Sequence, residues 1–313
     1  MSRLLEMIPV NGRVDNRCFL GAPWRLDNPS LEAGQMHYHI ILGGSVVLEE
    51  PSSGPPQRLI AGDILLLPHG GEHILHDGSG VAPKPARDRN GLALTFTEND
   101  GTGERLDMLC GRFVVSPMHE RLLRSYLPRR LVVRAAERSA STAQPETGSQ
   151  LAALVALMRM ESGMENLGGH AMLKALSTSM FALTLRLASE AREAPEGLLA
   201  LAGHSRLAPA LSALFNQPAH PWSLPELASL CSMSRATFVR HFHEKMGRSA
   251  SDMLIDIRMT VAANEMRRSP ASTGAVAESV GYRSEAAFQR AFKQHMGVTP
   301  AQWRRDAVQP RSF

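Results

Sequence analysis

Two arginines recur at equivalent positions of a repeated pattern near the C-terminus, and guanidinium groups are well suited to hydrogen bonding with the edges of DNA bases. Arg240 and Arg290 each belong to one copy of the pattern Ser-x-x-x-Phe-x-Arg-x-Phe-x-x-x-Met-Gly, which begins at Ser234 and again at Ser284. The two phenylalanines of each copy are four residues apart, so on a helix they share one face and form a small core. The arginine between them points elsewhere. We therefore predict that both arginines contact DNA.

The elements that must position these arginines are a short helix, a tight turn and a second helix. Each copy is preceded by a short apolar segment with a small residue, at residues 227–228 and 276–277. Serine is a favoured helix N-cap. Gly281 stands where the turn needs a left-handed backbone, and Ser232 stands there in the first copy. The pattern predicts two helix-turn-helix units, whose second helices enter the DNA major groove.

The predicted DNA contacts lie at the start of each second helix and along its exposed face. Helix N-termini bind phosphates, and long polar side chains on the exposed face reach base edges. The residues expected to make these contacts are Ser234, Arg235, Thr237, Arg240, Ser284, Glu285, Gln289 and Arg290.

The last hundred residues resemble the DNA-binding domain of the AraC family of bacterial transcription regulators. The resemblance is carried by residues 222–228, 233–238 and 297–305, and above all by AESVGYRSEAAFQRAF at residues 277–292. It implies two helix-turn-helix units joined by a long helix over residues 250–268, with recognition helices in successive major grooves about 34 Å apart. Double-stranded promoter DNA is the implied partner, and RNA polymerase is a further one.

The distribution of charge agrees with this assignment. Residues 204–313 contain 14 Lys and Arg residues and 8 Asp and Glu residues. Residues 1–203 contain 20 Lys and Arg residues and 22 Asp and Glu residues. A DNA-binding half needs such a basic excess because neutralising phosphates releases counterions and supplies non-specific affinity. A protein that was merely basic would spread the excess evenly.

Length and composition limit the remaining possibilities. A chain of 313 residues is expected to hold about two domains. The N-terminus has no signal-peptide pattern, and no run approaches the roughly 18 apolar residues of a membrane span. We therefore expect a cytoplasmic protein without a membrane partner. The three cysteines cannot form a disulfide framework and are not spaced for zinc.

The N-terminal part of the sequence contains short apolar runs separated by Gly, Pro and Asp residues. Residues 38–42, 45–49, 58–60 and 64–68 predict strands of a small antiparallel barrel. The segment GDILLLPHGGEH, which ends at His73, resembles the second motif of cupins. Residues 1–135 thus resemble the cupin-like sensor domain of one branch of AraC-type regulators. Residues 79–105, rich in Gly, Pro, Arg and Asp, predict a mobile loop.

The predicted fold class is α+β, with three parts along the chain. A cupin-like antiparallel β-barrel spans residues 1–135, a linker and dimerisation helices span 136–203, and an all-α AraC-type DNA-binding domain with two helix-turn-helix units spans 204–313. Residues 139–149 are polar and predict the linker. The helices that follow, between Leu151 and Leu187, are apolar around much of their circumference. They must be covered by the barrel or by a second subunit, and the resemblance favours a homodimer.

Three histidines match the ligand positions of metal-binding cupins, which use two histidines and a glutamate from the first motif and a histidine from the second. His37, His39 and His73 correspond, and imidazoles that converge inside a barrel could hold a divalent ion. The glutamate is missing, because Gly43 or Gly44 stands in its place. The resemblance to this branch of regulators instead implies a metal-free barrel, in which His39 and His73 are hydrogen-bonded core residues and His37 is partly exposed. No cofactor is expected, and a divalent metal is the alternative.

Two cysteines carry a further resemblance. The segments around Cys18 and Cys110 resemble those that hold the redox-active cysteines of a reactive-chlorine-responsive AraC-type activator, with the same domain order. This implies an oxidant-formed disulfide that acts as a signal. Arg17, beside Cys18, would favour the reactive thiolate. The dipeptide Cys110-Gly111 also occurs in cupin-type relatives that are not known as oxidant sensors.

Together these features predict a sequence-specific transcription regulator that is not an enzyme and whose barrel senses a signal. One alternative is a regulator that senses a metal or a small molecule without redox chemistry. Another is a metal-dependent cupin enzyme fused to a DNA-binding domain, which would need the missing glutamate.

Overall fold

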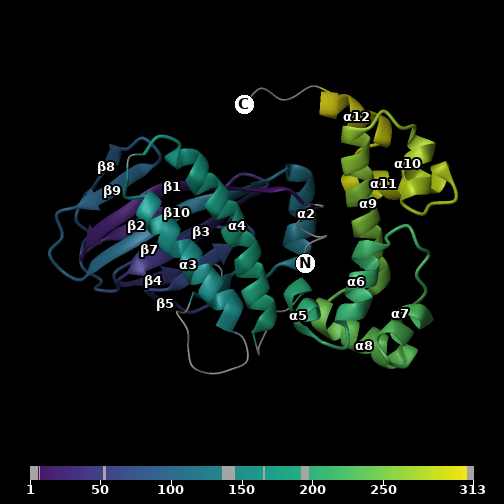
Figure 1. Cartoon of the computed structure of the whole chain (residues 1–313), viewed down its shortest axis with the longest axis horizontal. Coiled ribbons are helices and arrows are strands. Elements are labelled where there is room, and N and C mark those ends of the chain that lie inside the picture. Colours follow the sequence, from purple (N-terminus) through teal and green to yellow (C-terminus); the bar gives the residue numbers. More distant parts are fainter. Residues whose placement is uncertain are drawn as a thin grey trace. The chain divides into compact units, whose positions relative to one another are not determined.

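The structure, a computed structural model, describes residue 6 and residues 8–51, 54–135, 145–164, 166–191 and 197–308. The chain divides into two compact units (Figure 1), one formed by Val10–Pro195 and the other by Glu196–Phe313 together with Met1–Pro9. The first unit is rich in strands, and the second is helical. The α+β fold class is therefore confirmed.

Two sheets form the first unit. A seven-stranded sheet has the order β11-β6-β3-β10-β1-β9-β8, and a four-stranded sheet has the order β2-β7-β4-β5. Neighbouring strands pair antiparallel except β1 and β9, which are parallel. The strands are β1 (Val10–Gly21), β2 (Arg25–Asn28), β3 (Gln35–Gly43), β4 (Ser45–Glu49), β5 (Gln57–Ile60), β6 (Asp63–Leu67), β7 (His73–His76), β8 (Ala86–Asn90), β9 (Thr95–Asn99), β10 (Arg105–Val115) and β11 (Leu131–Arg134).

The expectation of a long loop over residues 79–105 is wrong. This segment contains β8 and β9, which pair with each other, and β9 also pairs with β1. All five residues of β8 are exposed polar or small residues, so the strand has no apolar face that its sequence could reveal. Pairing with a neighbouring strand, which the local sequence does not encode, decides its conformation.

The interior of the barrel unit is filled by apolar side chains from both sheets. In β3, side chains alternate between the two faces, so His37 and His39 face a cavity while Tyr38 faces the outer side. The buried residues of the interior cluster are Cys18, Leu20, Trp24, Ile41, Val46, Leu48, Leu59, Leu65, Leu67, Leu75, Leu106 and Met108.

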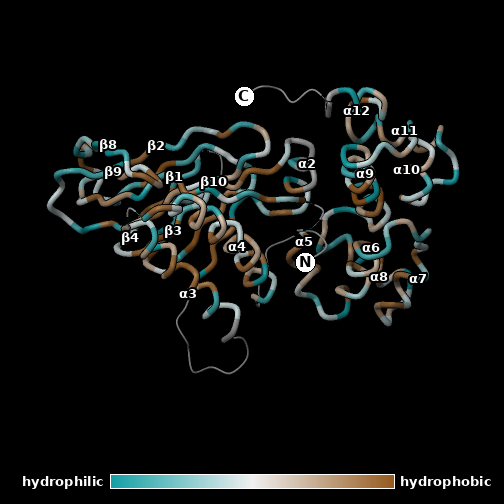
Figure 2. The backbone as a smooth tube through the Cα atoms, turned by 45° about the horizontal axis from the view of Figure 1, so that its top comes forward, coloured by the Kyte–Doolittle hydropathy of each residue, from teal (hydrophilic) through white to brown (hydrophobic). Residues whose placement is uncertain are grey.

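The outer side of the large sheet is covered by the predicted pair of helices, α3 (Pro145–Glu161) and α4 (Gly169–Glu190), which are largely hydrophobic in Figure 2. A further helix, α2 (Pro117–Tyr126), follows β10. The hydroxyl of Ser177 on α4 donates to the Tyr38 hydroxyl over 2.9 Å, and Phe181 packs on Phe113 with ring centroids 4.8 Å apart. A Cβ at Gly12 would collide with Ser177, so glycine allows this close approach. Helix α4 thus caps the barrel of its own chain.

The second unit consists of helices joined by short turns. They are α5 (Leu198–Gly203), α6 (Ala208–Asn216), α7 (Leu224–Leu230), α8 (Arg235–Met246), α9 (Ala250–Arg268), α10 (Thr273–Ser279), α11 (Glu285–Met296) and α12 (Pro300–Val308). The predicted connecting helix over residues 250–268 is confirmed as α9. No helix in the described parts of the chain is long and apolar enough to cross a membrane.

The two helix-turn-helix units have matching local geometry. The rings of Phe238 and Phe242 have centroids 5.5 Å apart at 48°, and the second pair, Phe288 and Phe292, has the same distance and angle. In the turns, Ser232 has φ 52° and Gly281 has φ 83°. The left-handed backbone is therefore present in both copies, although the first copy must place a serine there.

Candidate DNA-binding surface and barrel site

The residues predicted to contact DNA lie on α8 and α11 or at their first turns. The side chains of Arg235, Arg240, Gln289 and Arg290 are exposed, as expected for groups that meet a ligand. Both serine N-caps are present, because Ser234 accepts the amide proton of Thr237 and Ser284 that of Ala287.

Four of the residues predicted to contact DNA also contact one another within the protein, as two pairs. The hydroxyls of Ser234 and Thr237 lie 2.9 Å apart, so Thr237 completes the cap of α8 and is half-buried. On α11, the side-chain amide of Gln289 donates to the Glu285 carboxylate over 2.9 Å. This hydrogen bond orients both side chains on the exposed first turns of the helix.

Asp256, which was not among the predicted residues, links the two helix-turn-helix units. Its carboxylate on α9 accepts a hydrogen bond of 2.7 Å from Arg248, after α8, and its other oxygen lies 3.1 Å from Nε2 of His295 on α11. An acidic residue in the otherwise apolar face of α9 was the available signal. The link fixes the end of each recognition helix to the helix between them.

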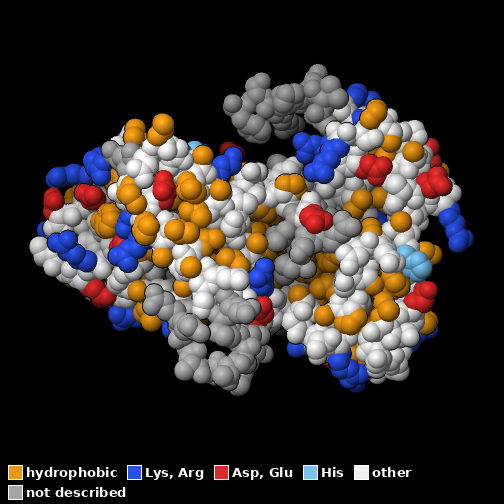
Figure 3. Space-filling view, viewed as in Figure 1, with side chains coloured by type: hydrophobic (Ala, Val, Ile, Leu, Met, Phe, Trp, Pro, Cys, Tyr) orange, Lys and Arg blue, Asp and Glu red, His pale blue; other side chains and the backbone are white. Residues whose placement is uncertain are grey.

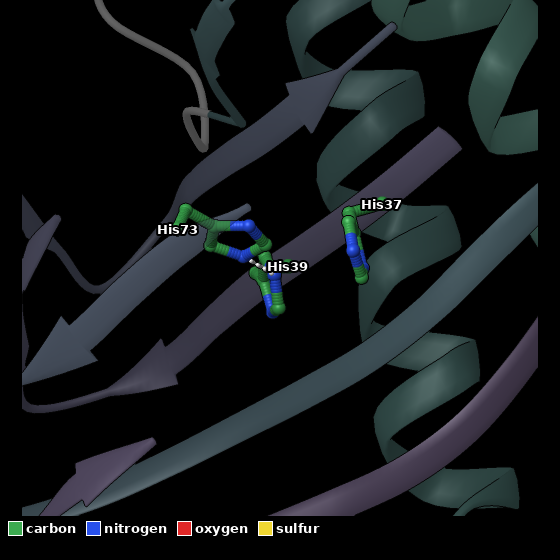
Figure 4. A group of neighbouring side chains, drawn as sticks. All are labelled: His37, His39 and His73. Atoms are coloured by element: carbon green, nitrogen blue, oxygen red, sulfur yellow. Dashed lines mark hydrogen bonds between the residues drawn. The ribbon is translucent and has the colours of Figure 1, made fainter. Parts of the chain in front are cut away.

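In the barrel unit, β1, β3 and β10 place two cysteines and two histidines around one cavity of about 470 Å³, and His73 on β7 lies in contact with His39. His37 and His39 come from β3, His73 begins β7, and Cys18 and Cys110 come from β1 and β10. Figure 4 shows the three imidazoles, with His39 and His73 in hydrogen-bonding contact. Cys18 is buried and Cys110 half-buried, and both line the cavity together with Asp15, Asn16, Asp88, Thr97 and Arg112.

These side chains form one chain of hydrogen bonds. The sulfurs of Cys18 and Cys110 lie 3.9 Å apart, Cys110 Sγ is 3.2 Å from His39 Nδ1, and His39 Nε2 is 2.8 Å from His73 Nε2. The chain ends where His73 Nδ1 lies 3.2 Å from the carbonyl oxygen of Gly71. That oxygen can accept but not donate, and each neutral imidazole has one donor and one acceptor. The protons are therefore ordered from Cys110 toward Gly71, with the Cys110 thiol donating to His39.

Burial keeps the three histidines uncharged near neutral pH. It lowers the pKa of His39 well below its usual value, and it lowers the pKa of His73 to about 4. Burial also lowers the pKa of His37, whose Nε2 lies 3.0 Å from the carbonyl oxygen of Pro29. The hydrogen bond with Cys18, together with burial, raises the pKa of the Cys110 thiol.

The structure places the Arg17 guanidinium and the Cys18 thiol on opposite faces of the sheet, although the two residues are adjacent in sequence. Adjacent residues of a strand point to opposite faces, so the Arg17 guanidinium lies on the outer face of the sheet. There it makes two hydrogen bonds with Asp107, of 3.1 and 3.0 Å. The thiol of Cys18 lies on the inner face and contacts Cys110.

The structure brings together the three histidines that the cupin resemblance proposed as metal ligands. One nitrogen of each lies within 4.8 Å of the others, and all three residues are buried. Neutral imidazoles are suitable ligands for a transition metal. Among the residues that the structure describes, this group contains no carboxylate. Gly43 and Gly44 lie at the end of β3 and in the turn to β4.

Comparison with known proteins follows the same division of the chain. A family model described as a cupin matches residues 1–190, and a helix-turn-helix domain model matches residues 227–306. The chain belongs to the cupin-containing AraC-type transcription regulators. Its cupin-like domain is the sensing part of a sequence-specific, DNA-binding regulator.

Relatives of this AraC-type regulator match it over nearly their whole length. An HTH-type transcriptional regulator of Haemophilus influenzae is 28% identical over 97% of this chain and 98% of its own. The RCS-specific HTH-type transcriptional activator RclR of Escherichia coli is 27% identical over 97% of this chain and 96% of its own. The HTH-type transcriptional regulator MtrA of Neisseria gonorrhoeae is 28% identical over 99% of each chain.

Solved structures similar to this AraC-type regulator include the DNA-binding domain of AdpA in complex with a target DNA. It is 30% identical and covers 34% of this chain and 98% of the AdpA chain, with a TM-score of 0.32. ToxT of Vibrio cholerae is 12% identical over 97% of this chain and 100% of its own, with a TM-score of 0.38.

The buried histidines predict a pH dependence of the stability of the barrel unit. His73 binds a proton in the unfolded chain below about pH 6.5, but in the folded unit only near pH 4. Protonation therefore favours the unfolded state as the pH falls from about 6.5 to 4. The loss at the lower end is about 3 kcal/mol from His73, and His39 adds to it in the same direction.

Urea unfolding between pH 4 and 7 tests this prediction. The fluorescence of Trp24, which is buried in the barrel interior, reports the transition when Trp222 and Trp303 are replaced by Phe. The His73→Gln variant should show a flatter pH dependence over this window, whereas His170→Gln, at an exposed position of α4, should not. Equal slopes for both variants would show that His73 is not the titrating group.

Proposed function

We propose that this regulator responds to oxidants by forming a disulfide between Cys18 and Cys110. The observation that carries the proposal is the 3.9 Å separation of the two sulfurs beside a cavity. A disulfide needs about 2.05 Å between sulfurs, so a small shift closes the bond. The relative named as an RCS-specific activator supports the same signal.

The reaction proposed with hypochlorous acid has two steps. Cys18 and Cys110 both line the cavity, but Cys110 is half-buried whereas Cys18 is buried, so Cys110 meets the oxidant first. The sulfur of Cys110 takes the chlorine, and its proton leaves with the hydroxide as water. The Cys18 sulfur then attacks this sulfenyl chloride, forming the disulfide and releasing chloride and a proton.

Two other functions remain as outcomes of the tests. A metal ion on His37, His39 and His73 would make the barrel a metal sensor, supported by their mutual distances. A polar small molecule could instead occupy the cavity.

We propose that the protein is not an enzyme, because its relatives are named regulators and the imidazole group has no carboxylate among the residues described. As a regulator of promoters it would act in the cytoplasm, where it meets RNA polymerase.

The proposed DNA contacts are made by Arg240 and Arg290 at base edges and by the first turns of α8 and α11 at phosphates. The support is the exposure of both arginines and the matching geometry of the two units. The neighbours Arg235, Glu285 and Gln289 share the exposed surface.

A homodimer through α3 and the start of α4 is also part of the proposal. Although α4 caps its own barrel, exposed hydrophobic side chains remain on α3 and on the connection to α4, and hydrophobic side chains gather over these helices in Figure 3. Apolar clusters of this kind mark interaction surfaces. We call these residues the α3 apolar face: Leu157, Met160, Met164, Leu167 and Met172.

The Arg290→Ala variant should lose about 1–3 kcal/mol of affinity for the preferred DNA site and relax specificity at one base pair. Lys293→Ala, in the last turn of the same helix, removes a charge at another exposed position and should weaken binding to all sequences alike. Affinities for a library of sites at fixed salt would measure both. A uniform loss for Arg290→Ala would move this arginine from the bases to the phosphate backbone.

Peptide mapping after treatment with hypochlorous acid should reveal a crosslink between Cys18 and Cys110. Cys18→Ser should abolish the promoter response to the oxidant while DNA binding of the untreated protein is unchanged. Cys231→Ser is the matched control, because Cys231 is buried in the helical unit and should leave the response intact. If Cys18→Ser still responds, a ligand or metal in the barrel becomes the better account, and metal analysis of the purified protein separates those two.

Leu157→Asp should convert the dimer into a folded monomer, because it places a charge in the middle of the α3 apolar face. Leu157 is 51% exposed, so the folded subunit itself loses little. Thr102→Asp, at an exposed loop position, adds the same charge away from this face and should remain dimeric. Light scattering at micromolar concentration measures the mass of each variant in solution and so its oligomeric state. A monomeric wild-type protein would contradict the proposed dimer.

A further inference from the structure

Arg17 occupies an unusual position for a charged residue, because it is 6% exposed and lies next to a sensor cysteine in β1. Its guanidinium makes two hydrogen bonds with the carboxylate of Asp107 on β10. The ring of Phe19 lies beneath it, with 4.7 Å from the guanidinium carbon to the ring centroid. Burying an arginine is costly unless its charge is paired and its N–H groups donate hydrogen bonds. Asp107 accepts from two of the five N–H donors of the Arg17 guanidinium.

The remaining contacts of Arg17 reach the end of α3. Its Nη1 donates to the main-chain oxygen of Arg159 over 2.9 Å and to the hydroxyl of Ser162 over 3.0 Å. Helix C-termini carry unsatisfied carbonyls and partial negative charge, so a buried cation there is favourable. Arg159 itself lies 3.5 Å from Asp107. The cysteine strand and the end of α3 are therefore joined at one carboxylate.

This junction adjoins the α3 apolar face. Met160 directly follows Arg159, whose carbonyl oxygen Arg17 holds, and is 55% exposed. Met164 lies two residues beyond Ser162 and is also exposed. A displacement of Arg17 thus changes the position of the hydrophobic side chains that a second subunit would meet.

Disulfide closure acts on the two strands that hold this junction. The sulfurs must approach by about 1.9 Å, from 3.9 Å to the length of a disulfide bond. Cys18 lies on β1 beside Arg17, and Cys110 lies on β10, three residues after Asp107. The register of these strands shifts between Val14 and Asn16, where Asp15 forms a bulge. Bulges are local irregularities at which a strand can bend.

We propose that Arg17 is the positioning residue that transmits the state of the cysteines to α3. Movement of β1 against β10 on disulfide formation shifts the Arg17–Asp107 pair, which pulls the carbonyl end of α3 and re-orients the α3 apolar face. This inference rests on the proposed redox function, because it assigns the route by which that signal leaves the barrel.

Arg17→Lys in the full-length protein is the test. Lysine keeps the charge beside Asp107 but lacks the planar fork of donors that reaches Arg159 and Ser162. The variant should form the Cys18–Cys110 crosslink at the wild-type rate and bind DNA normally when reduced, yet lose the promoter response to hypochlorous acid. Arg13→Lys is the matched control on the same strand, where the arginine is exposed and pairs with Asp15. It should respond like the wild type.

A second measurement examines the junction without any oxidant. Amide hydrogen exchange at residues 158–164 of the reduced protein should speed up by about tenfold or more in Arg17→Lys, the factor expected from losing a hydrogen bond to a charged group. Ser162→Ala removes one acceptor from the helix side and should cause a smaller change in the same direction. Arg13→Lys should cause none.

The outcomes separate the two proposals. A wild-type protein that forms no crosslink contradicts the redox function, while the exchange measurement still decides whether Arg17 holds α3. An Arg17→Lys variant that crosslinks and responds like the wild type overturns the transmission role. Unchanged exchange at residues 158–164 in Arg17→Lys overturns it as well.

Discussion

The pairing of β1 with β10 is the constraint on which the barrel site depends. Neighbouring residues of a strand face opposite sides, so the register Cys18↔Met108 puts Cys18 and Cys110 toward the cavity and Arg17 and Asp107 toward the helices. A slip of one residue would exchange these sets and bury the ion pair in the apolar interior. The same ladder therefore forms the inner face, which carries reactive groups, and the outer face, which carries the contacts to α3.

The geometry of the inner face implies that the proposed thiol chemistry and metal binding would compete in this barrel. The ordered chain of protons needs one hydrogen between His39 Nε2 and His73 Nε2, which lie 2.8 Å apart. An ion bound by both nitrogens would displace that hydrogen, because ligating imidazole nitrogens must be unprotonated. His39 would then have to carry its proton on Nδ1, and it could no longer accept from the Cys110 thiol. The His39 imidazole would thus connect the two proposed signals.

The DNA-binding unit was predictable almost residue by residue because its determinants are local. Serine caps, a left-handed turn position and phenylalanines four apart each act within one or two helical turns. The structure accordingly begins α8 and α11 after Ser234 and Ser284, and α9 has the expected bounds. The exception is Asp256, whose partners Arg248 and His295 come from different elements. An acidic residue in the apolar face of α9 indicates that Asp256 has a partner, but the sequence does not identify Arg248 and His295 as its partners.

The barrel was predictable as a class of fold, but the facing of its key residues was not. In a strand with one solvent-exposed face, apolar and polar residues alternate, and this alternation reveals which side chains point inward. In β1, however, Arg17 and Cys18 are consecutive and both buried, because the cavity side and the helix side are each covered. The alternation is lost, and adjacency in sequence suggested a contact between two side chains that lie on opposite faces. Only the pairing with β10 and the cover by α3 assign the two side chains to opposite faces, and both of those contacts are distant in sequence.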